Sequence, residues 1–136
     1  VAPVEETVNG TIAFPPSQWD GRPVRGLVLQ IAQGRVVGFD ATSGHEAVEA
    51  ELATIPEVAR AFREFALGFN PLLAVPEHYP WIPYYGYGAG VVRLSLGDNS
   101  ELGGTVTGGY VRWNFFTDTT VTIGDDVWVR DGKLVR

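Results

Sequence analysis

Two arginines and an asparagine lie on predicted strands on either side of a glycine-rich turn, within residues 90–114. Alternation from residue 91 to 96 predicts a strand that carries Arg93. Strand-like residues resume at Tyr110, and a period of two places Tyr110, Arg112 and Asn114 on one face. A guanidinium group stays protonated at ordinary pH and donates hydrogen bonds in a planar fork, so both arginines suit an anion such as a carboxylate.

The segment between these strands contains two pairs of adjacent glycines, Gly103-Gly104 and Gly108-Gly109. Such pairs indicate a backbone with positive φ or the close approach of another group. Before them, Gly97, Asp98 and Asn99 form a predicted turn. We therefore expect a tightly folded loop next to the arginines.

Composition excludes several classes of protein and site. The net charge is −6 and the ten basic residues are scattered, so the chain has no basic stripe for nucleic acid. Without cysteine it has no disulfide, thiolate nucleophile or cysteine-ligated metal. No apolar run has the length of a membrane span, and the N-terminal residues Val1, Ala2 and Pro3 do not have the layout of a signal peptide. A cytoplasmic location is expected, and residues 1–136 are expected to form one domain.

Other catalytic and binding motifs find little support. His45 and His78 are far apart and are interpreted as surface groups. Neither a nucleophile elbow, a zinc-protease helix motif nor a phosphate-binding loop occurs. The carboxylates of Asp118, Asp125 and Asp126 are interpreted as solvated groups in turns.

Most of the chain reads as antiparallel strands. Strands are predicted at residues 8–14, 22–31 and 36–39, with Gln33-Gly34 turning the second into the third. Trp19 is placed in the loop between the first two strands. Residues 64–71 read as an extended segment closed by a turn, and residues 119–135 as a closing meander.

Two helix starts are predicted from capping boxes. Ser43 with Glu46 opens a helix that is expected to bury Val48, Leu52 and Ile55. Thr54 with Glu57 opens a second, short helix, whose expected members are Val58, Ala59 and Phe62. The fold class is therefore α+β, mainly antiparallel sheet with one or two short helices.

Residues 75–90 form a proline- and aromatic-rich segment, VPEHYPWIPYYGYGAG, that fits neither a regular helix nor a central strand. Its aromatic residues suggest either a lid packed on the core or a contact surface. Tyr85 and Tyr87 are its candidate binding residues.

Several segments together resemble the C-terminal domain of the aminopeptidase T-like leucyl aminopeptidases, which are two-domain peptidases with two metal ions. APVEETVNGTIAF is similar to the segment after the first glutamate ligand of that family, and GRPVRGLVLQIAQGRVVGFDA to the next hairpin. EFALGFNP, RLSLGDNSELGG and RWN resemble its E-L-G-I-G-T-N-P, H-I-A-L-G-x-N…G-G and H-W-D segments, and DDVWVRDGKLV its last hairpin. The resemblance covers nearly the whole chain.

The resemblance also implies which ligands have changed. Glu64 matches a retained ligand, whereas Arg93 and Arg112 stand at histidine positions and Asn114 at the aspartate position. The first glutamate is expected upstream of Val1. Because guanidinium has no lone pair to offer and repels divalent cations, we expect a metal-free site without peptidase chemistry and without a cofactor.

Two interpretations of the cationic site stay open. Glu64 could pair with Arg93 or Arg112 in a structural ion-pair cluster. Alternatively, the site binds the carboxylates or C-terminus of a peptide, which could also add as a strand. The predicted peptide-binding residues are Glu64, Asn70, Tyr85, Tyr87, Arg93, Gly103, Gly104, Tyr110, Arg112, Trp113 and Asn114.

The predicted function is that of a non-catalytic peptide-binding protein. By analogy of fold, it would present a precursor peptide to a partner enzyme in ribosomal-peptide natural-product maturation. One alternative is a structural or homodimerisation module, because a domain taken from a two-domain protein exposes a former interface. The other is residual metal-independent activity with Glu64 as base, which is weak because neighbouring arginines stabilise the carboxylate.

Overall fold

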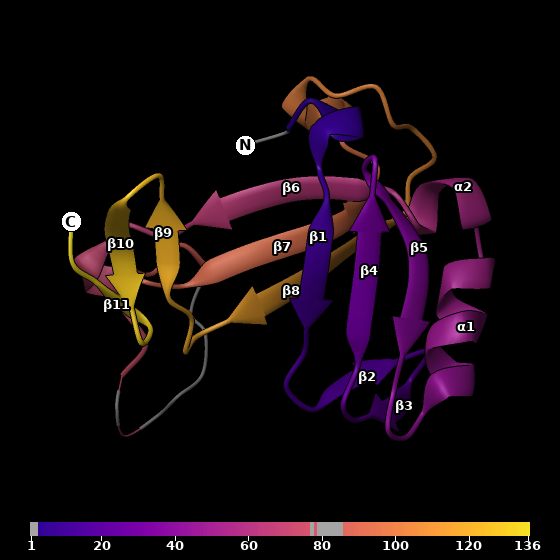
Figure 1. Ribbon diagram of the computed structural model, residues 1–136, viewed down its shortest axis with the longest axis horizontal. Coiled ribbons are helices and arrows are strands. Elements are labelled where there is room, and N and C mark those ends of the chain that lie inside the picture. The colour runs from indigo at the N-terminus through magenta and orange to yellow at the C-terminus, as the bar shows by residue number, and fades with distance from the viewer. Residues whose placement is uncertain (1–2, 77, 79–85) are drawn as a thin grey trace. The chain divides into compact units, whose positions relative to one another are not determined.

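The computed structural model describes residues 3–76, 78 and 86–136 (Figure 1). Most of these residues are in antiparallel sheet or connecting loops, with two short α-helices among the described residues, so the predicted α+β class is confirmed. The chain divides into two compact units. The first contains residues 1–64 and 95–112, and the second contains residues 65–94 and 113–136.

The first unit contains a sheet with the strand order β1-β4-β5 (Figure 1). Its strands are β1 (Gly10–Ala13), β4 (Val28–Ala32) and β5 (Arg35–Asp40), all antiparallel. Gln33 and Gly34 both have positive φ in the turn from β4 to β5, as a tight hairpin requires. This hairpin and the first strand confirm the sequence prediction.

The predicted strand 22–31 is wrong as one element. It is divided into β3 (Arg22–Val24) and β4 by Gly26, whose φ is +63° and whose missing Cβ would collide with Thr42. β3 pairs instead with β2 (Ser17–Trp19), which was predicted as loop. The alternation of apolar and polar residues continues through residues 25–27, where the strand is interrupted, so periodicity alone could not reveal the interruption.

The capping boxes are also wrong, although both helices exist. α1 (His45–Ala53) begins after Gly44 in the left-handed conformation, and α2 (Pro56–Ala59) follows Ile55; neither has a side-chain cap. The Thr54 hydroxyl donates back to the carbonyl oxygens of Ala50 and Glu51. Ile55 is 39% exposed rather than buried, and Phe62 starts a strand rather than continuing α2.

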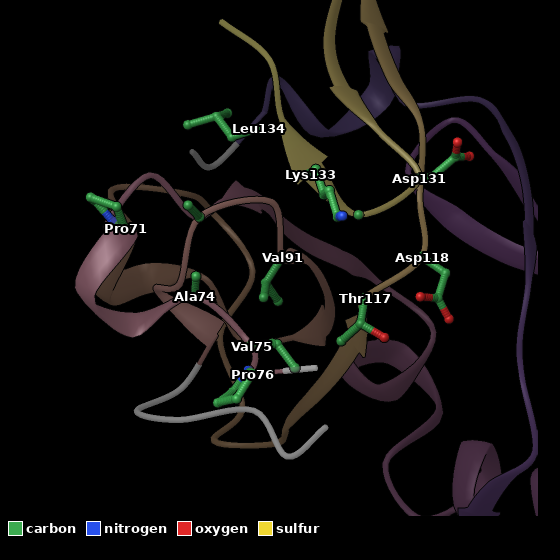
Figure 2. Close-up of a pocket in the computed structure, with 12 residues that line it drawn as sticks. Pro71, Ala74, Val75, Pro76, Val91, Thr117, Asp118, Asp131, Lys133 and Leu134 are labelled. Atoms are coloured by element: carbon green, nitrogen blue, oxygen red, sulfur yellow. The ribbon is translucent and has the colours of Figure 1, made fainter. Parts of the chain in front are cut away.

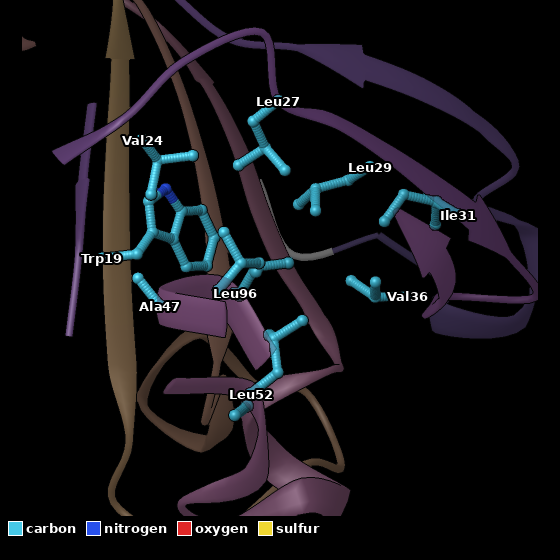
Figure 3. Close-up of a cluster of buried hydrophobic side chains, with 11 residues drawn as sticks. Trp19, Val24, Leu27, Leu29, Ile31, Val36, Ala47, Leu52 and Leu96 are labelled. Atoms are coloured by element: carbon cyan, nitrogen blue, oxygen red, sulfur yellow. The ribbon is translucent and has the colours of Figure 1, made fainter. Parts of the chain in front are cut away.

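The core of the first unit forms where α1 packs against β2 and β3 (Figure 3). Trp19 is fully buried, and Figure 3 shows its ring beside Leu96 and Val24. The cluster consists of Trp19, Val24, Leu27, Leu29, Ile31, Val36, Ala47, Val48, Leu52, Ala59 and Leu96. Burying a large apolar side chain contributes about 1.5–3 kcal/mol, so this cluster contributes substantially to the stability of the unit.

A further sheet has the strand order β6-β7-β8, with β6 (Phe62–Leu67), β7 (Val92–Gly97) and β8 (Val111–Phe116). Residues 62–64, 95–97 and 111–112 of these strands belong to the first unit, and their other residues belong to the second. Three 3-10 turns, η1 (Glu5–Thr7), η2 (Pro71–Leu73) and η4 (Ser100–Leu102), lie in the connecting segments that the structure describes.

The second unit ends in a small sheet with the strand order β11-β10-β9. Its strands are β9 (Val121–Ile123), β10 (Asp126–Arg130) and β11 (Lys133–Leu134), which confirms the predicted meander. Gly132, with φ +77°, has no room for a Cβ because the carbonyl oxygen of Thr117 lies against it. Among the helices of residues 3–76, 78 and 86–136, none combines the length and apolar character needed to span a bilayer.

Candidate functional site

Glu64 lies in the first unit, near the middle of β6, and is 4% exposed. Its Oε2 accepts hydrogen bonds from Nη1 of Arg63 at 2.8 Å and from the Ser95 hydroxyl at 3.1 Å. The Glu64 carboxylate therefore lies in a buried ion pair with Arg63, a residue that the sequence did not single out. Pairing of Glu64 with Arg93 or Arg112 stays a prediction.

Arg63 is fixed by several acceptors at once, and only 2% of it is exposed. Its Nε donates to the Asp98 carbonyl oxygen at 2.7 Å, and its Nη2 donates to the Glu101 carboxylate. The Nη1 group also contacts the Ser95 hydroxyl at 3.3 Å. A buried guanidinium with this many acceptors is held in one position, and it places a positive charge beside Glu64.

Arg112 lies in another polar cluster of the first unit. Nη1 of Arg112 donates to Glu51 Oε2 at 2.8 Å, Nη2 donates to the Gln18 carbonyl oxygen at 2.8 Å, and the guanidinium lies 3.5 Å from the ring centroid of Trp19. Tyr110 donates its hydroxyl hydrogen to the same Glu51 oxygen at 3.0 Å. Burial, and then the Glu51 charge, raise the pKa of Tyr110 above its ordinary range. Tyr110 and Arg112 thus meet at one carboxylate, as their shared face suggested.

The loop from Asp98 to Gly109 in the first unit is organised by a single carboxylate. Asp98 accepts hydrogen bonds from the amide and hydroxyl of Ser100 and from the amides of Gly108 and Gly109, at 2.6–2.9 Å. The Ser100 hydroxyl, followed by the Gly109 amide, holds the pKa of Asp98 below its ordinary range. The predicted turn is therefore a closed loop that surrounds Asp98.

The predicted features of the two glycine pairs are present. Gly103, Gly108 and Gly109 have positive φ, and a Cβ on Gly104 would meet the Asn99 side chain. The amides of Gly103 and Gly104 donate to the carbonyl oxygens of Ser100 and Asn99, so they serve the loop itself. A role of Gly103 and Gly104 in peptide binding stays a prediction.

Asn99 and Glu5 tie this loop to the N-terminal segment of the first unit. Asn99 is fully buried and donates to Glu5 Oε1 at 3.1 Å, while the Thr105 amide donates to the same oxygen at 2.9 Å. The Thr105 amide is the main cause that lowers the pKa of Glu5 to about 2. No sequence pattern indicated this contact between residues so far apart.

In the second unit, Arg93 lies on β7 and is 8% exposed. Its guanidinium carbon lies 5.4 Å from the ring centroid of Tyr87 and 5.7 Å from that of Trp113, within the range of cation–π contacts. The two aromatic residues are 48% and 41% exposed. A positive charge thus lies close to two aromatic side chains that reach solvent.

The remaining predicted site residues have structural contacts. Asn114 is buried and donates to the Leu94 carbonyl oxygen at 3.1 Å, and Asn70 caps η2 by accepting from the Leu72 amide at 3.0 Å. Tyr85 lies outside the described residues, as does much of the aromatic segment. Whether this segment is a lid on the core or a contact surface therefore stays a prediction. Glu64, Gly103, Gly104, Tyr110 and Arg112 belong to the first unit, and Asn70, Tyr87, Arg93, Trp113 and Asn114 to the second.

The side chains at the positions that the resemblance singles out as ligand positions do not fit a metal ion. Arg63 holds a positive charge 2.8 Å from the Glu64 carboxylate, and the guanidinium groups of Arg93 and Arg112 have no lone pair to donate. In the part of the chain that the structure describes, no group of three or more His, Asp or Glu residues is arranged to hold a metal.

Comparisons with known proteins agree with the peptidase resemblance over the N-terminal half. The family model for thermophilic metalloproteases (M29) matches residues 1–72, which include Glu64 and Asn70. A search of curated proteins finds no match.

Among solved structures, the 2,5-dihydroxypyridine dioxygenase from Pseudomonas putida KT2440 is similar, with a TM-score of 0.71 and 17% identity. The match covers 98% of this chain but only 42% of that protein. At this identity the likeness concerns the fold alone, and it extends to the segments after residue 72 that carry both arginines.

Proposed function

Because this chain belongs to the thermophilic metalloprotease (M29) family, we propose that it is a peptidase-derived domain that binds a peptide without cleaving it. Its proposed ligand is a peptide that offers a carboxylate, either its C-terminus or an acidic side chain. The observation that carries the proposal is the position of Arg93 within cation–π distance of two partly exposed aromatic residues, Tyr87 and Trp113.

This arrangement supports peptide binding on two grounds. Arginine pairs with carboxylates through charge-assisted hydrogen bonds, which are about twice as strong as neutral ones. Tyrosine and tryptophan provide large contact areas while losing little conformational entropy, so they are enriched where proteins bind peptides and partners. A carboxylate bound at Arg93 would have aromatic surface beside it for a neighbouring side chain.

The absence of catalysis is proposed from the chemistry of the side chains. Metallopeptidases depend on water activated by a metal, and the resemblance places imidazoles where this chain has Arg93 and Arg112. Glu64 is also a poor general base, since Arg63 and Ser95 both donate to its carboxylate oxygen and stabilise its charged form.

The cellular role that we propose is presentation of a precursor peptide to a partner enzyme, as in the maturation of ribosomally made natural products. This role rests on analogy with the peptide grooves of peptidases. It predicts that modification of a peptide by its enzyme is faster when this chain is added.

Isothermal titration calorimetry of wild-type protein and an Arg93→Gln variant tests the binding proposal. The titrant is a short aromatic peptide with a free or an amidated C-terminus. Loss of a charged hydrogen-bond partner costs about 1.5–3 kcal/mol, so the free-carboxylate peptide should bind Arg93→Gln about tenfold or more weakly. Amidation should weaken wild-type binding to a similar degree, and Arg93→Lys should restore part of it.

The matched control is Arg130→Gln, which removes an exposed arginine from β10 of the same unit. Equal affinities of the Arg93→Gln and Arg130→Gln proteins would contradict the proposal, as would the absence of binding at millimolar peptide. A separate assay with a leucine anilide and added zinc or cobalt tests the lack of catalysis. Turnover that co-purifies with the protein and stops with chelator would show that it is an active peptidase.

A further inference from the structure

A cavity of about 590 Å³ lies within the second unit (Figure 2). This volume is within the range of small-molecule and side-chain binding pockets, about 300–1,000 Å³. None of Arg93, Tyr87 and Trp113 lines it, so it is separate from the arginine and aromatic cluster.

One side of the cavity is apolar. It is formed by the segment around η2, by two residues ahead of β7 and by β11; these residues are Pro71, Ala74, Val75, Pro76, Ala89, Val91 and Leu134. Val91, one of these residues, is buried. Such a surface is suited to an aliphatic chain rather than to a polar group.

The other side carries charge. This side is lined by two aspartates and one lysine, Asp118, Asp131 and Lys133, together with Thr117. The formal net charge of these side chains is −1. In Figure 2, Asp118 lies beside Thr117, on the side of the cavity away from Pro71. An occupant should therefore have an aliphatic part and a positively charged end.

The charged side is also rigid, because the backbone of its turn is packed without space for side chains. Gly132 has the Thr117 carbonyl oxygen against it, and the carbonyl oxygen of Gly132 itself lies against Gly90. The Gly132 amide donates to the carbonyl oxygen of Thr119 at 2.8 Å. The backbone that carries Asp118 is consequently packed against the Gly132 turn, and the exposed carboxylate extends from it at the edge of the cavity.

We propose that this cavity binds a lysine or arginine side chain of the peptide ligand, with its methylene stem on the apolar side and its charge at Asp118. Long basic side chains bury their stems on apolar surface and keep the charged end near solvent. The inference rests on the proposed peptide binding and names a second feature of the peptide, beyond the carboxylate that Arg93 takes.

Four versions of one short peptide separate the two sites in a calorimetric titration. The peptide has either lysine or norleucine at one position, which have the same stem with and without the ammonium group, and either a free or an amidated C-terminus. Norleucine should weaken binding about fivefold, the upper range for an exposed charge pair, and higher salt should reduce this difference. Asp118→Asn should abolish the preference for lysine, whereas Asp125→Asn, a change at an exposed residue outside the cavity, should not.

A variant that fills the cavity tests whether the methylene stem of the peptide side chain packs on the apolar side. Ala74→Phe should weaken both the lysine and the norleucine peptides, while Leu72→Phe, at a 91% exposed neighbour that does not line the cavity, should leave both unchanged. Folding of each variant is checked by its thermal unfolding midpoint.

The outcomes distinguish the two proposals. Binding that depends on Arg93 and the free carboxylate, but not on lysine or Asp118, would overturn the cavity inference and leave the proposed function standing. Binding that depends on lysine and Asp118 but not on Arg93 would support the cavity and refute the role of Arg93. Absence of binding by all four peptides would refute both.

Discussion

Replacing Arg63 with methionine is expected to destabilise the first unit severely. Methionine retains much of the apolar stem but removes the charge that neutralises Glu64, which is 4% exposed. It also removes the donors to the Asp98 carbonyl oxygen and to Ser95. The Ser95 hydroxyl would still donate to Glu64, but this buried carboxylate would have lost the Arg63 charge that lies 2.8 Å from it.

The size of the effect follows from this burial. Removing one partner of a buried ion pair costs about 3–5 kcal/mol, because the other charge is left without compensation. A protein of 136 residues has a free energy of unfolding of about 7–20 kcal/mol, so this is a large fraction. With a urea m-value of about 2 kcal/mol/M, the unfolding midpoint should fall by about 2 M.

Urea unfolding followed by tryptophan fluorescence measures this change, with Arg25→Met as the matched control at an exposed arginine of the same unit. Adding Glu64→Gln to Arg63→Met should restore about 1–3 kcal/mol, since the buried charge is removed. A double variant no more stable than Arg63→Met alone would show that the two side chains are not coupled. Because Arg63 supplies the positive charge, chelator should leave the wild-type midpoint unchanged; a fall would refute the reasoning.

Three further predictions concern the polar clusters of the first unit. Glu5 has a pKa of about 2 against an ordinary value of 4.5, so the stability it contributes is present above about pH 4.5 and is lost as the pH falls towards 2. The destabilisation by Glu5→Gln should therefore shrink over that window in urea midpoints, and a constant difference would contradict it. Glu51→Gln should cost about 1–3 kcal/mol by removing the partner of Arg112, and absorbance titration should show Tyr110 ionising at lower pH than in wild type. Gly108→Ala should cost about 1–3 kcal/mol in urea unfolding, because φ is positive there and the Val58 side chain occupies the Cβ position; an unchanged midpoint would show that the loop adapts.

Much of the fold was accessible from alternation and turn chemistry. The hairpin at Gln33-Gly34, the strand carrying Arg93 and the closing meander were predicted because their signals lie within a few residues of one another. The errors came where a tertiary contact overrides a local pattern. Gly26 breaks an alternating strand because its backbone packs on Thr42, and Ser43 does not cap α1 because Gly44 takes the left-handed conformation instead.

The candidate site was harder to predict than the fold. The sequence singled out Arg93, Arg112 and Glu64, but it could not supply their partners, since Glu51 lies 61 positions from Arg112. Arg63 was missed for another reason: neighbouring residues of a strand are expected to face opposite ways, yet Arg63 and Glu64 are both buried and paired. Electrostatic pairing of this kind depends on three-dimensional position rather than on spacing in the chain.

The loop closed around Asp98 also makes this domain attractive for protein engineering. Its shape depends on the four donors to one carboxylate and on the buried Asn99, while Leu102 and Thr107 are exposed. Randomising such outward positions while retaining Asp98 and Asn99 would give a combinatorial library on a preformed frame. New recognition specificities could then be selected from it without redesigning the scaffold.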